Sequence, residues 1–191
     1  MGKTWFQKLF SSTPPPEPES APVELDRSNA DVQFGLGLKY ANPMGLAPDY
    51  AQAAGWYLKA AEQNHSLAQF NLGVMYARGQ GVPRSESESA VWMGRAANQG
   101  DAGAQYILGM KHLRDAFEGL PVAVLESRIE GYKWLQLSSA QGYNGSASAC
   151  ESLSLSMSHE AVTEANRRVT GFLAERSRKG PSPGTSLSPD N

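Results

Sequence analysis

The sequence contains one cysteine, Cys150, and three histidines that stand far apart along its 191 residues. A single cysteine cannot form an internal disulfide, and isolated histidines do not supply the clustered ligands of a metal site. The formal net charge is only -2, so no strong field of one sign draws the chain to nucleic acid. No apolar run approaches the ~18 residues of a membrane-spanning helix. These absences predict no metal, no cofactor and no nucleic-acid partner.

Proline is concentrated near the two ends of the chain, where it predicts segments that cannot pack a core. Residues 11–28 combine three consecutive prolines with scattered acidic residues and predict a disordered linker. Residues 179–191 are similar and predict a disordered tail. We expect one folded domain between them, at residues 29–178. No secretory signal is evident, which predicts a cytoplasmic location.

Residues 1–10 form a separate short segment with an apolar face. Trp5, Phe6, Leu9 and Phe10 fall on one side of a helix. Four large exposed apolar residues at the end of a predicted disordered linker are unusual. Two interpretations stay open: the segment folds onto the protein's own core, or it anchors the protein to a membrane surface or a partner groove.

The middle of the chain repeats with a step of 36 residues. A Leu-Gly pair marks each unit: Leu36-Gly37, Leu72-Gly73 and Leu108-Gly109. A tryptophan follows in each unit, four residues before a pair of small residues: Trp56, Trp92 and Trp134. The last two tryptophans are 42 residues apart, so the third unit holds six extra residues. We expect the insertion, at residues 115–125, to protrude as a loop or a short helical turn.

Apolar residues at helical spacing predict two helices in each unit. A glycine inside a helix costs about 1 kcal/mol relative to alanine, and the three Leu-Gly glycines share one register. The simplest reason is a close helix crossing, where a side chain would hold the backbones apart. Residues 158–178 predict a closing helix with Ser158 as its N-cap. The predicted fold is all-α, a solenoid of about three helix-turn-helix repeats with C-terminal capping helices.

The second unit resembles the Sel-one-like repeat (SLR) family, a relative of the tetratricopeptide repeat. The matching positions are Ala68, Leu72-Gly73, Tyr76, Gly79-Gln80-Gly81-Val82, Trp92 and Ala96-Ala97. The first unit has a different turn, and the third replaces the tyrosine with His112 and the alanine pair with two serines. The resemblance implies a right-handed solenoid that serves as an interaction scaffold, often in bacterial assemblies, with no shared catalytic residues.

We therefore predict a non-catalytic adaptor that binds a protein or peptide. The resemblance places the first helix of each unit on the concave side, where positions two before and two after each glycine share one helix face. The predicted contact residues are Lys39, Asn71, Met75, Ile107 and Lys111. The alternative is that these five positions are ordinary exposed helix surface with no role in binding. Two alternatives for the whole protein are a peripheral membrane tether using residues 1–10 and a hydrolase whose site the sequence does not reveal.

Overall fold

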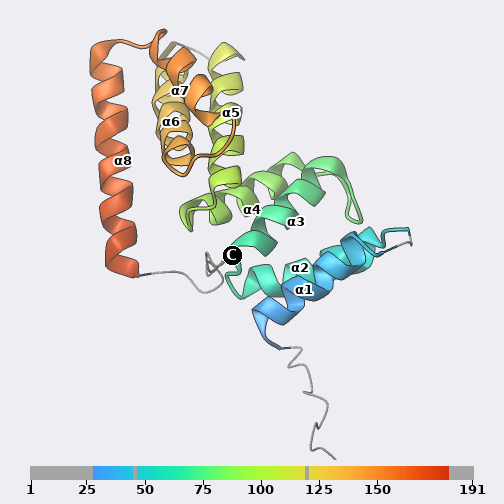
Figure 1. Ribbon diagram of the computed structural model, residues 1–191. Helices are drawn as coiled ribbons and strands as arrows, with labels where there is room; N and C mark the ends of the chain where they lie inside the picture. The colour runs from blue at the N-terminus through green and yellow to red at the C-terminus, as the bar shows by residue number, and fades with distance from the viewer. Residues whose placement is uncertain (1–27, 45–46, 119–120, 181–191) are drawn as a thin grey trace, which may run out of the picture.

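The computed structural model describes residues 28–44, 47–118 and 121–180, which form eight α-helices and no strand (Figure 1). The helices are α1 (Ala30–Ala41), α2 (Tyr50–Glu62), α3 (Ser66–Arg78), α4 (Glu86–Asn98), α5 (Ala102–Glu118), α6 (Pro121–Ala140), α7 (Ser146–Ser154) and α8 (His159–Lys179). The first six pair as the hairpins α1–α2, α3–α4 and α5–α6, which stack in chain order. The predicted all-helical repeat fold is confirmed.

Each repeat begins with a side chain that caps its first helix. Asn29, His65 and Asp101 stand 36 residues apart. Nδ1 of His65 accepts from the Ala68 N–H at 3.2 Å, and Oδ1 of Asp101 accepts from the Ala104 N–H at 2.7 Å. Oδ1 of Asn29 does the same for the start of α1. These bonds satisfy backbone donors that a helix start leaves unpaired, so the cap fixes where each repeat begins.

The helices of each hairpin cross closely at the Leu-Gly glycines, as predicted. A Cβ atom on Gly37 would lie 2.5 Å from the Tyr57 ring. On Gly73 it would lie 3.0 Å from the Met93 side chain. On Gly109 it would lie 2.7 Å from Leu135. All three distances are at or inside the limit of ordinary packing, so these positions have no room for a side chain without movement.

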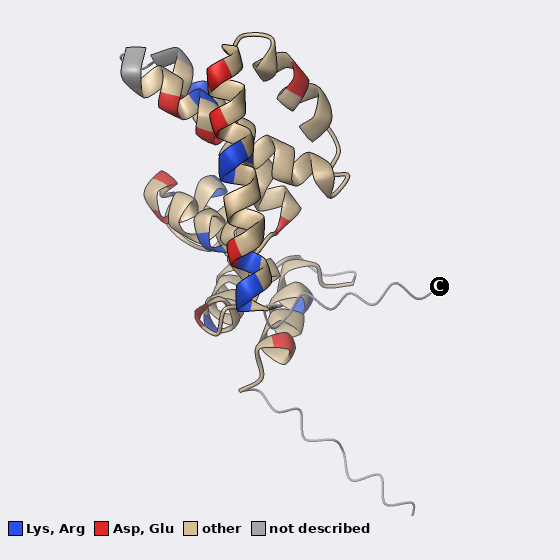
Figure 2. Ribbon diagram, turned by 90° about the vertical axis from the view of Figure 1, so that its left-hand side faces the viewer, with Lys and Arg blue, Asp and Glu red and all other residues tan. Residues whose placement is uncertain are grey.

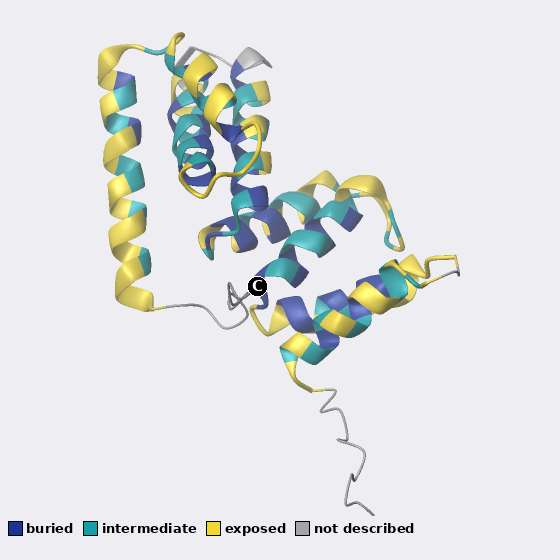
Figure 3. Ribbon diagram, in the orientation of Figure 1, coloured by how far each residue is buried: buried dark blue, intermediate teal, exposed yellow. Residues whose placement is uncertain are grey.

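The core is distributed along the stack. One buried cluster joins the first repeat to the second and includes Tyr57, Leu72 and Trp92. A second cluster joins the second repeat to the third and includes Met93 and Trp134. Figure 3 shows buried residues on the facing sides of the helices and exposed residues along the outer edges. Each repeat is therefore stabilised mainly by its neighbours.

A ladder of glutamine side chains runs along the edge where successive repeats join. Within each hairpin, a glutamine that follows the second helix donates to a glutamine near the start of the first. The pairs are Gln63 to Gln33 at 2.8 Å, Gln99 to Gln69 at 2.7 Å and Gln141 to Gln105 at 2.9 Å. Gln69 and Gln105 also donate to the preceding repeat, to the carbonyl oxygens of Ala61 and Ala97. These bonds satisfy buried polar groups and link neighbouring hairpins.

At residues 115–125, where a loop or a short helical turn is expected, the described residues are helical. The described part of this segment continues α5 to Glu118 and starts α6 at Pro121, so α5 has 17 residues and α6 has 20, against 13 each for α3 and α4. Ala116 is buried, and Pro121 stands at the first helical position, where its missing N–H is no loss. The insertion therefore lengthens a hairpin.

Helices α7 and α8 close the C-terminal end. Ser158 caps α8 through the Ala161 N–H, as predicted. Helix α8 runs beside α6, where Phe172 meets the Trp134 ring edge-on with centroids 5.5 Å apart. Arg168 of α8 forms ion pairs with three carboxylates: Glu126, Glu130 and Glu164. Figure 2 looks toward the side where α8 lies and shows basic and acidic residues in small separate groups.

Candidate partner-binding groove

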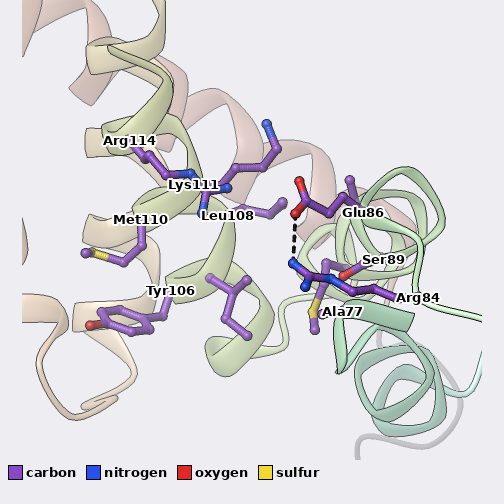
Figure 4. Close-up of a pocket in the computed structure, with 12 residues that line it drawn as sticks. Ala77, Arg84, Glu86, Ser89, Tyr106, Leu108, Met110, Lys111 and Arg114 are labelled. Atoms are coloured by element: carbon purple, nitrogen blue, oxygen red, sulfur yellow. Dashed lines mark hydrogen bonds and ion pairs between the residues drawn. The ribbon is translucent and has the colours of Figure 1, made fainter. Parts of the chain in front are cut away.

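A groove of about 510 Å³ lies between the α3–α4 hairpin and α5 (Figure 4). Its inner wall contains Met93 and Leu108, which belong to the buried cluster between the second and third repeats. The stacking of hairpins that builds the core therefore also positions the groove.

One face of α5 supplies the exposed wall of the groove. Ile107, Met110, Lys111 and Arg114 are separated by three, four and seven residues, the spacing of neighbours on a helix. Ile107 and Met110 are each 37% exposed. Tyr106 extends this apolar strip, and its ring lies 5.3 Å from that of Tyr143. The strip offers apolar contact area that the described part of the protein leaves open to solvent.

The charges on the rim are mostly paired. Arg84 and Glu86 form an ion pair at 3.2 Å, and Lys111 pairs with Asp115 at 2.5 Å. Arg114 is exposed, and no ion pair joins it to an acidic side chain of residues 28–44, 47–116 or 123–180. A guanidinium can bind a carboxylate through two parallel hydrogen bonds. The groove thus combines an apolar strip with an exposed cation.

The structure separates the contact residues that the sequence predicted. Ile107 and Lys111 line the groove together. Lys39 is exposed but lies in the first repeat, in a different hollow that also includes Met44. Asn71 is half-buried and hydrogen bonds with Tyr57; this bond opposes the rise in the Tyr57 pKa that burial causes.

Met75 cannot be a contact residue, and this part of the prediction is wrong. Its side chain is 5% exposed and packs in the same buried cluster as Trp92. Lys39 and Met75 occupy equivalent positions in the first and second repeats. Lys39 is exposed, whereas Met75 is buried because the second repeat has a neighbouring hairpin on each side.

Sequence reasoning missed most of the residues that line the groove, among them Arg84, Met110 and Arg114. The helical spacing that starts at Ile107 would have identified the two on α5. Arg84 comes from the turn before α4, and its position depends on tertiary packing. The predicted anchor residues Trp5, Phe6, Leu9 and Phe10 lie outside the described residues.

No catalytic or metal-binding constellation is found in the part of the chain that the structure describes. No three His, Cys, Asp or Glu residues gather there as metal ligands. Burial raises the pKa of the Cys150 thiol, against a hydrogen bond with Tyr132 that lowers it. A raised pKa disfavours the reactive thiolate. Within the same residues, no helix has both the length and the apolar character to cross a membrane.

Comparison with known proteins identifies the repeats. The family model of the Sel1 repeat matches residues 30–65, 66–101 and 102–143. These three segments coincide with the three stacked hairpins. No curated protein matches the chain.

Two solved structures are similar. A Sel1 repeat protein from Oxalobacter formigenes is 34% identical, with a TM-score of 0.56 over 66% of this chain and 91% of that chain. A protective antigen present in uropathogenic Escherichia coli strains, which displays an SLR fold, has a TM-score of 0.64 at 23% identity. That match covers 86% of this chain and 34% of the antigen, so this chain spans about a third of the antigen's length. The second likeness shows a shared fold.

Proposed function

Because the chain belongs to the Sel1 repeat family, we propose that it is a non-catalytic adaptor that binds a protein or peptide partner in the groove beside α5. Proteins of this family generally serve as interaction scaffolds. The observation that carries the proposal is the strip formed by Ile107 and Met110, which is apolar and exposed next to the exposed guanidinium of Arg114.

The groove favours a partner segment with two features. Apolar side chains bury Ile107 and Met110, and methionine adapts its shape to different surfaces. An acidic residue pairs with Arg114, which gives the segment its orientation and register. Lys111 adds positive charge nearby, although Asp115 already neutralises part of it. Lys39 and Asn71 stand outside this groove, and their contact with a partner stays a prediction.

Site-specific photo-crosslinking in cells that produce the protein tests this proposal. A photoreactive amino acid at Met110 is expected to trap a partner, whereas the same group at Val91 is not. Val91 is the matched control because it is 49% exposed on α4 and does not line the groove. Equal trapping from both positions would show that the groove has no special role.

Charge reversal then tests the acidic feature. Arg114→Glu is expected to weaken binding of the trapped partner by about tenfold or more, the scale of a lost charge-assisted hydrogen bond. Arg178→Glu makes the same change in charge at an exposed position of α8, outside the groove, and is expected to leave binding unchanged. Parent-like affinity of the Arg114 variant, with its helical content intact, would reject the role of Arg114.

A further inference from the structure

The three repeat tryptophans differ in how well they are covered. Trp92 and Trp134 are each 7% exposed, whereas Trp56 is only partly buried. Trp92 reaches back into the cluster of the first repeat, beside Tyr57 and Ala60. The equivalent Trp56 belongs to the first hairpin, so no described hairpin precedes it. Its exposure follows from its place at the end of the stack.

A hollow of about 470 Å³ surrounds this tryptophan. Its lining residues all belong to α2 or its N-cap: Asp49, Ala51, Gln52, Gly55, Trp56 and Lys59. Nothing lies within 4 Å of the position that a Cβ would take on Gly55. Nζ of Lys59 lies 4.2 Å from the centre of the Trp56 ring. The face is open within the described residues, although in a solenoid each such face normally receives another element or a cap.

We propose that residues 1–10 of the same chain cover this face and cap the first repeat. The four apolar residues of this segment are spaced so that a helical turn presents them together. They would contact Trp56 and the small residues beside it, where an aromatic pair adds stability beyond the buried area. The segment would thereby take the place that a preceding hairpin takes for the second and third repeats. This face lies apart from the groove beside α5, so the proposal stands or falls independently of the adaptor function.

The chain between the segment and the first repeat is long enough. The described chain begins at Ser28, whose carbonyl oxygen accepts a hydrogen bond from Gln63 Nε2 at 2.8 Å, at the C-terminal end of α2. Residues 11–27 provide seventeen connecting positions, and at about 3.1 Å per residue an extended chain of that length reaches roughly 50 Å. The 13 residues of α2 span about 20 Å at 1.5 Å per residue. Every part of the face is within reach.

Tethering also favours this occupant over others. A segment joined to the first repeat by seventeen residues is present at its own binding face at an effective concentration of about millimolar. A second copy of the protein or a membrane surface must compete with that concentration. Both remain outcomes that the experiments below distinguish.

Paramagnetic relaxation measured by nuclear magnetic resonance tests the contact in the full chain. A nitroxide label on Gln7→Cys, with Cys150→Ser to leave one thiol, is expected to reduce the amide signals of Gln52, Gly55 and Trp56. The same label on Leu155→Cys, an exposed position just after α7, is the control and is expected to leave those signals intact. Unchanged α2 signals with the label at position 7 would overturn the proposal.

The same label distinguishes a contact within one chain from a contact between copies. Protein that carries the nitroxide but no ¹⁵N is mixed with protein that carries ¹⁵N but no nitroxide. If α2 signals of the ¹⁵N protein weaken in this mixture, a second copy covers the face and the proposal is wrong. Vesicles containing anionic lipid provide the other arm. Sedimentation that depends on residues 1–10, together with unaffected α2 signals in solution, would assign the segment to a membrane surface.

A double-mutant cycle tests the energetic link. Deleting residues 2–10 is expected to lower the urea midpoint of the parent protein. In a Trp56→Ala background the same deletion is expected to have a much smaller effect, because the contacting ring is already absent. Equal effects in the two backgrounds, or no effect in the parent, would show that the segment and Trp56 do not interact.

Discussion

At the scale of single residues, the glycines in these helices fall into two groups that look alike in sequence. Gly109 lies where α5 meets α6, with Leu135 and the Gly131 carbonyl oxygen close to the position of an added Cβ. Gly94 lies inside α4 with nothing within 4 Å of that position. The first group is required by packing, and the second lowers the stability of its helix without a packing reason.

Alanine substitutions should therefore have opposite signs at these two sites. Gly109→Ala is expected to reduce the free energy of unfolding by about 1–2 kcal/mol, because overpacking outweighs the gain in helix propensity. Gly94→Ala is expected to increase it by about 0.5–1 kcal/mol. Urea unfolding of both variants at one pH measures the difference. The same sign at both positions would mean that the crossing at Gly109 is not tight.

The His65 side chain combines three roles at the start of the second repeat. Its Nδ1 accepts the capping hydrogen bond from Ala68, its Nε2 lies 3.3 Å from Asp31, and its ring stacks on Phe34. Burial lowers the pKa of His65 from its usual 6.5, against the attraction of Asp31. A proton on Nδ1 would also remove the cap. The neutral imidazole is thus the form that supports the fold.

This arrangement predicts a loss of stability in acid. Because the pKa of His65 is lower in the folded protein, the unfolded chain binds more protons as the pH falls below about 6.5. The contribution of His65 is therefore complete above that pH and is lost as the pH falls through the folded pKa. His65→Asn keeps a capping side chain, as Asn29 does in the first repeat, and is expected to flatten this dependence. His112, whose pKa burial also lowers, is present in both proteins. Equal slopes of unfolding free energy against pH would contradict the assignment to His65.

At the scale of secondary-structure elements, α8 is held by two different kinds of contact. Phe172 and Val169 add to the buried cluster around Trp134, and Arg168 pairs with carboxylates of α6 and of α8 itself. Hydrogen bonds from Arg167 and Arg168 lower the pKa of Glu164 to about 2. Arg168 therefore serves docking of α8 on α6, whereas Arg167 pairs only within α8.

Replacing each arginine separately should show whether the ion pairs with α6 hold α8 in place or whether only the surface charge matters. Arg168→Met is expected to lower the free energy of unfolding by about 1 kcal/mol and to increase amide exchange in α8, because three carboxylates lose their shared partner. Arg167→Met is the control, since Arg167 is 75% exposed and pairs only within α8. We expect it to leave exchange unchanged. The effect of Arg168→Met should also shrink in high salt; identical exchange in the two variants would show that the ion pairs do not hold the helix.

The helices were largely predictable from sequence, and the groove was predictable only in part. Repetition of Leu-Gly pairs and tryptophans identified the hairpins because each marks a contact that every repeat must make. The sequence left the insertion open between a loop and a helical turn. In the structure its described residues lengthen both helices, and Ala116 is buried. Met75 was misjudged because register alone does not say which neighbours surround a position. Arg84 comes from a turn, where no periodicity exists to follow.

At the scale of the whole molecule, stability comes from contacts between neighbouring repeats, and the buried residues of the eight described helices form several clusters along the stack. Gln69 is fully buried at one such junction. Its amide donates to the Ala61 carbonyl oxygen at 3.0 Å and accepts from Gln99 at 2.7 Å. Damage at this point should therefore spread to the adjoining repeats and fade with distance along the stack.

Gln69→Leu tests this expectation. It removes the acceptor of the Gln99 amide and one donor to the Ala61 carbonyl oxygen, which still accepts from the Asn64 N–H. It should lower stability by about 1–3 kcal/mol. Hydrogen exchange should rise most in α1 to α4 and least in α7 and α8. Gln136→Leu is the matched control, because Oε1 of Gln136 is buried without a hydrogen-bond partner among the described residues. That change should be neutral or stabilising, and uniform loss of protection in the Gln69 variant would argue for one cooperative unit.

The glutamine ladder also shows where in a hairpin the chain length can change. Its paired glutamines are 30 residues apart in the first two hairpins and 36 apart in the third, yet the bond is the same. The six additional residues were absorbed at the opposite edge, where the two helices of a hairpin meet. Length can therefore vary freely only along that edge. Along the ladder edge the chain can gain or lose whole repeats. Removing residues 66–101 as a block would leave Gln105 to take the place of Gln69 beside Ala61, and a shorter stack with the same hydrogen bonds between repeats would remain.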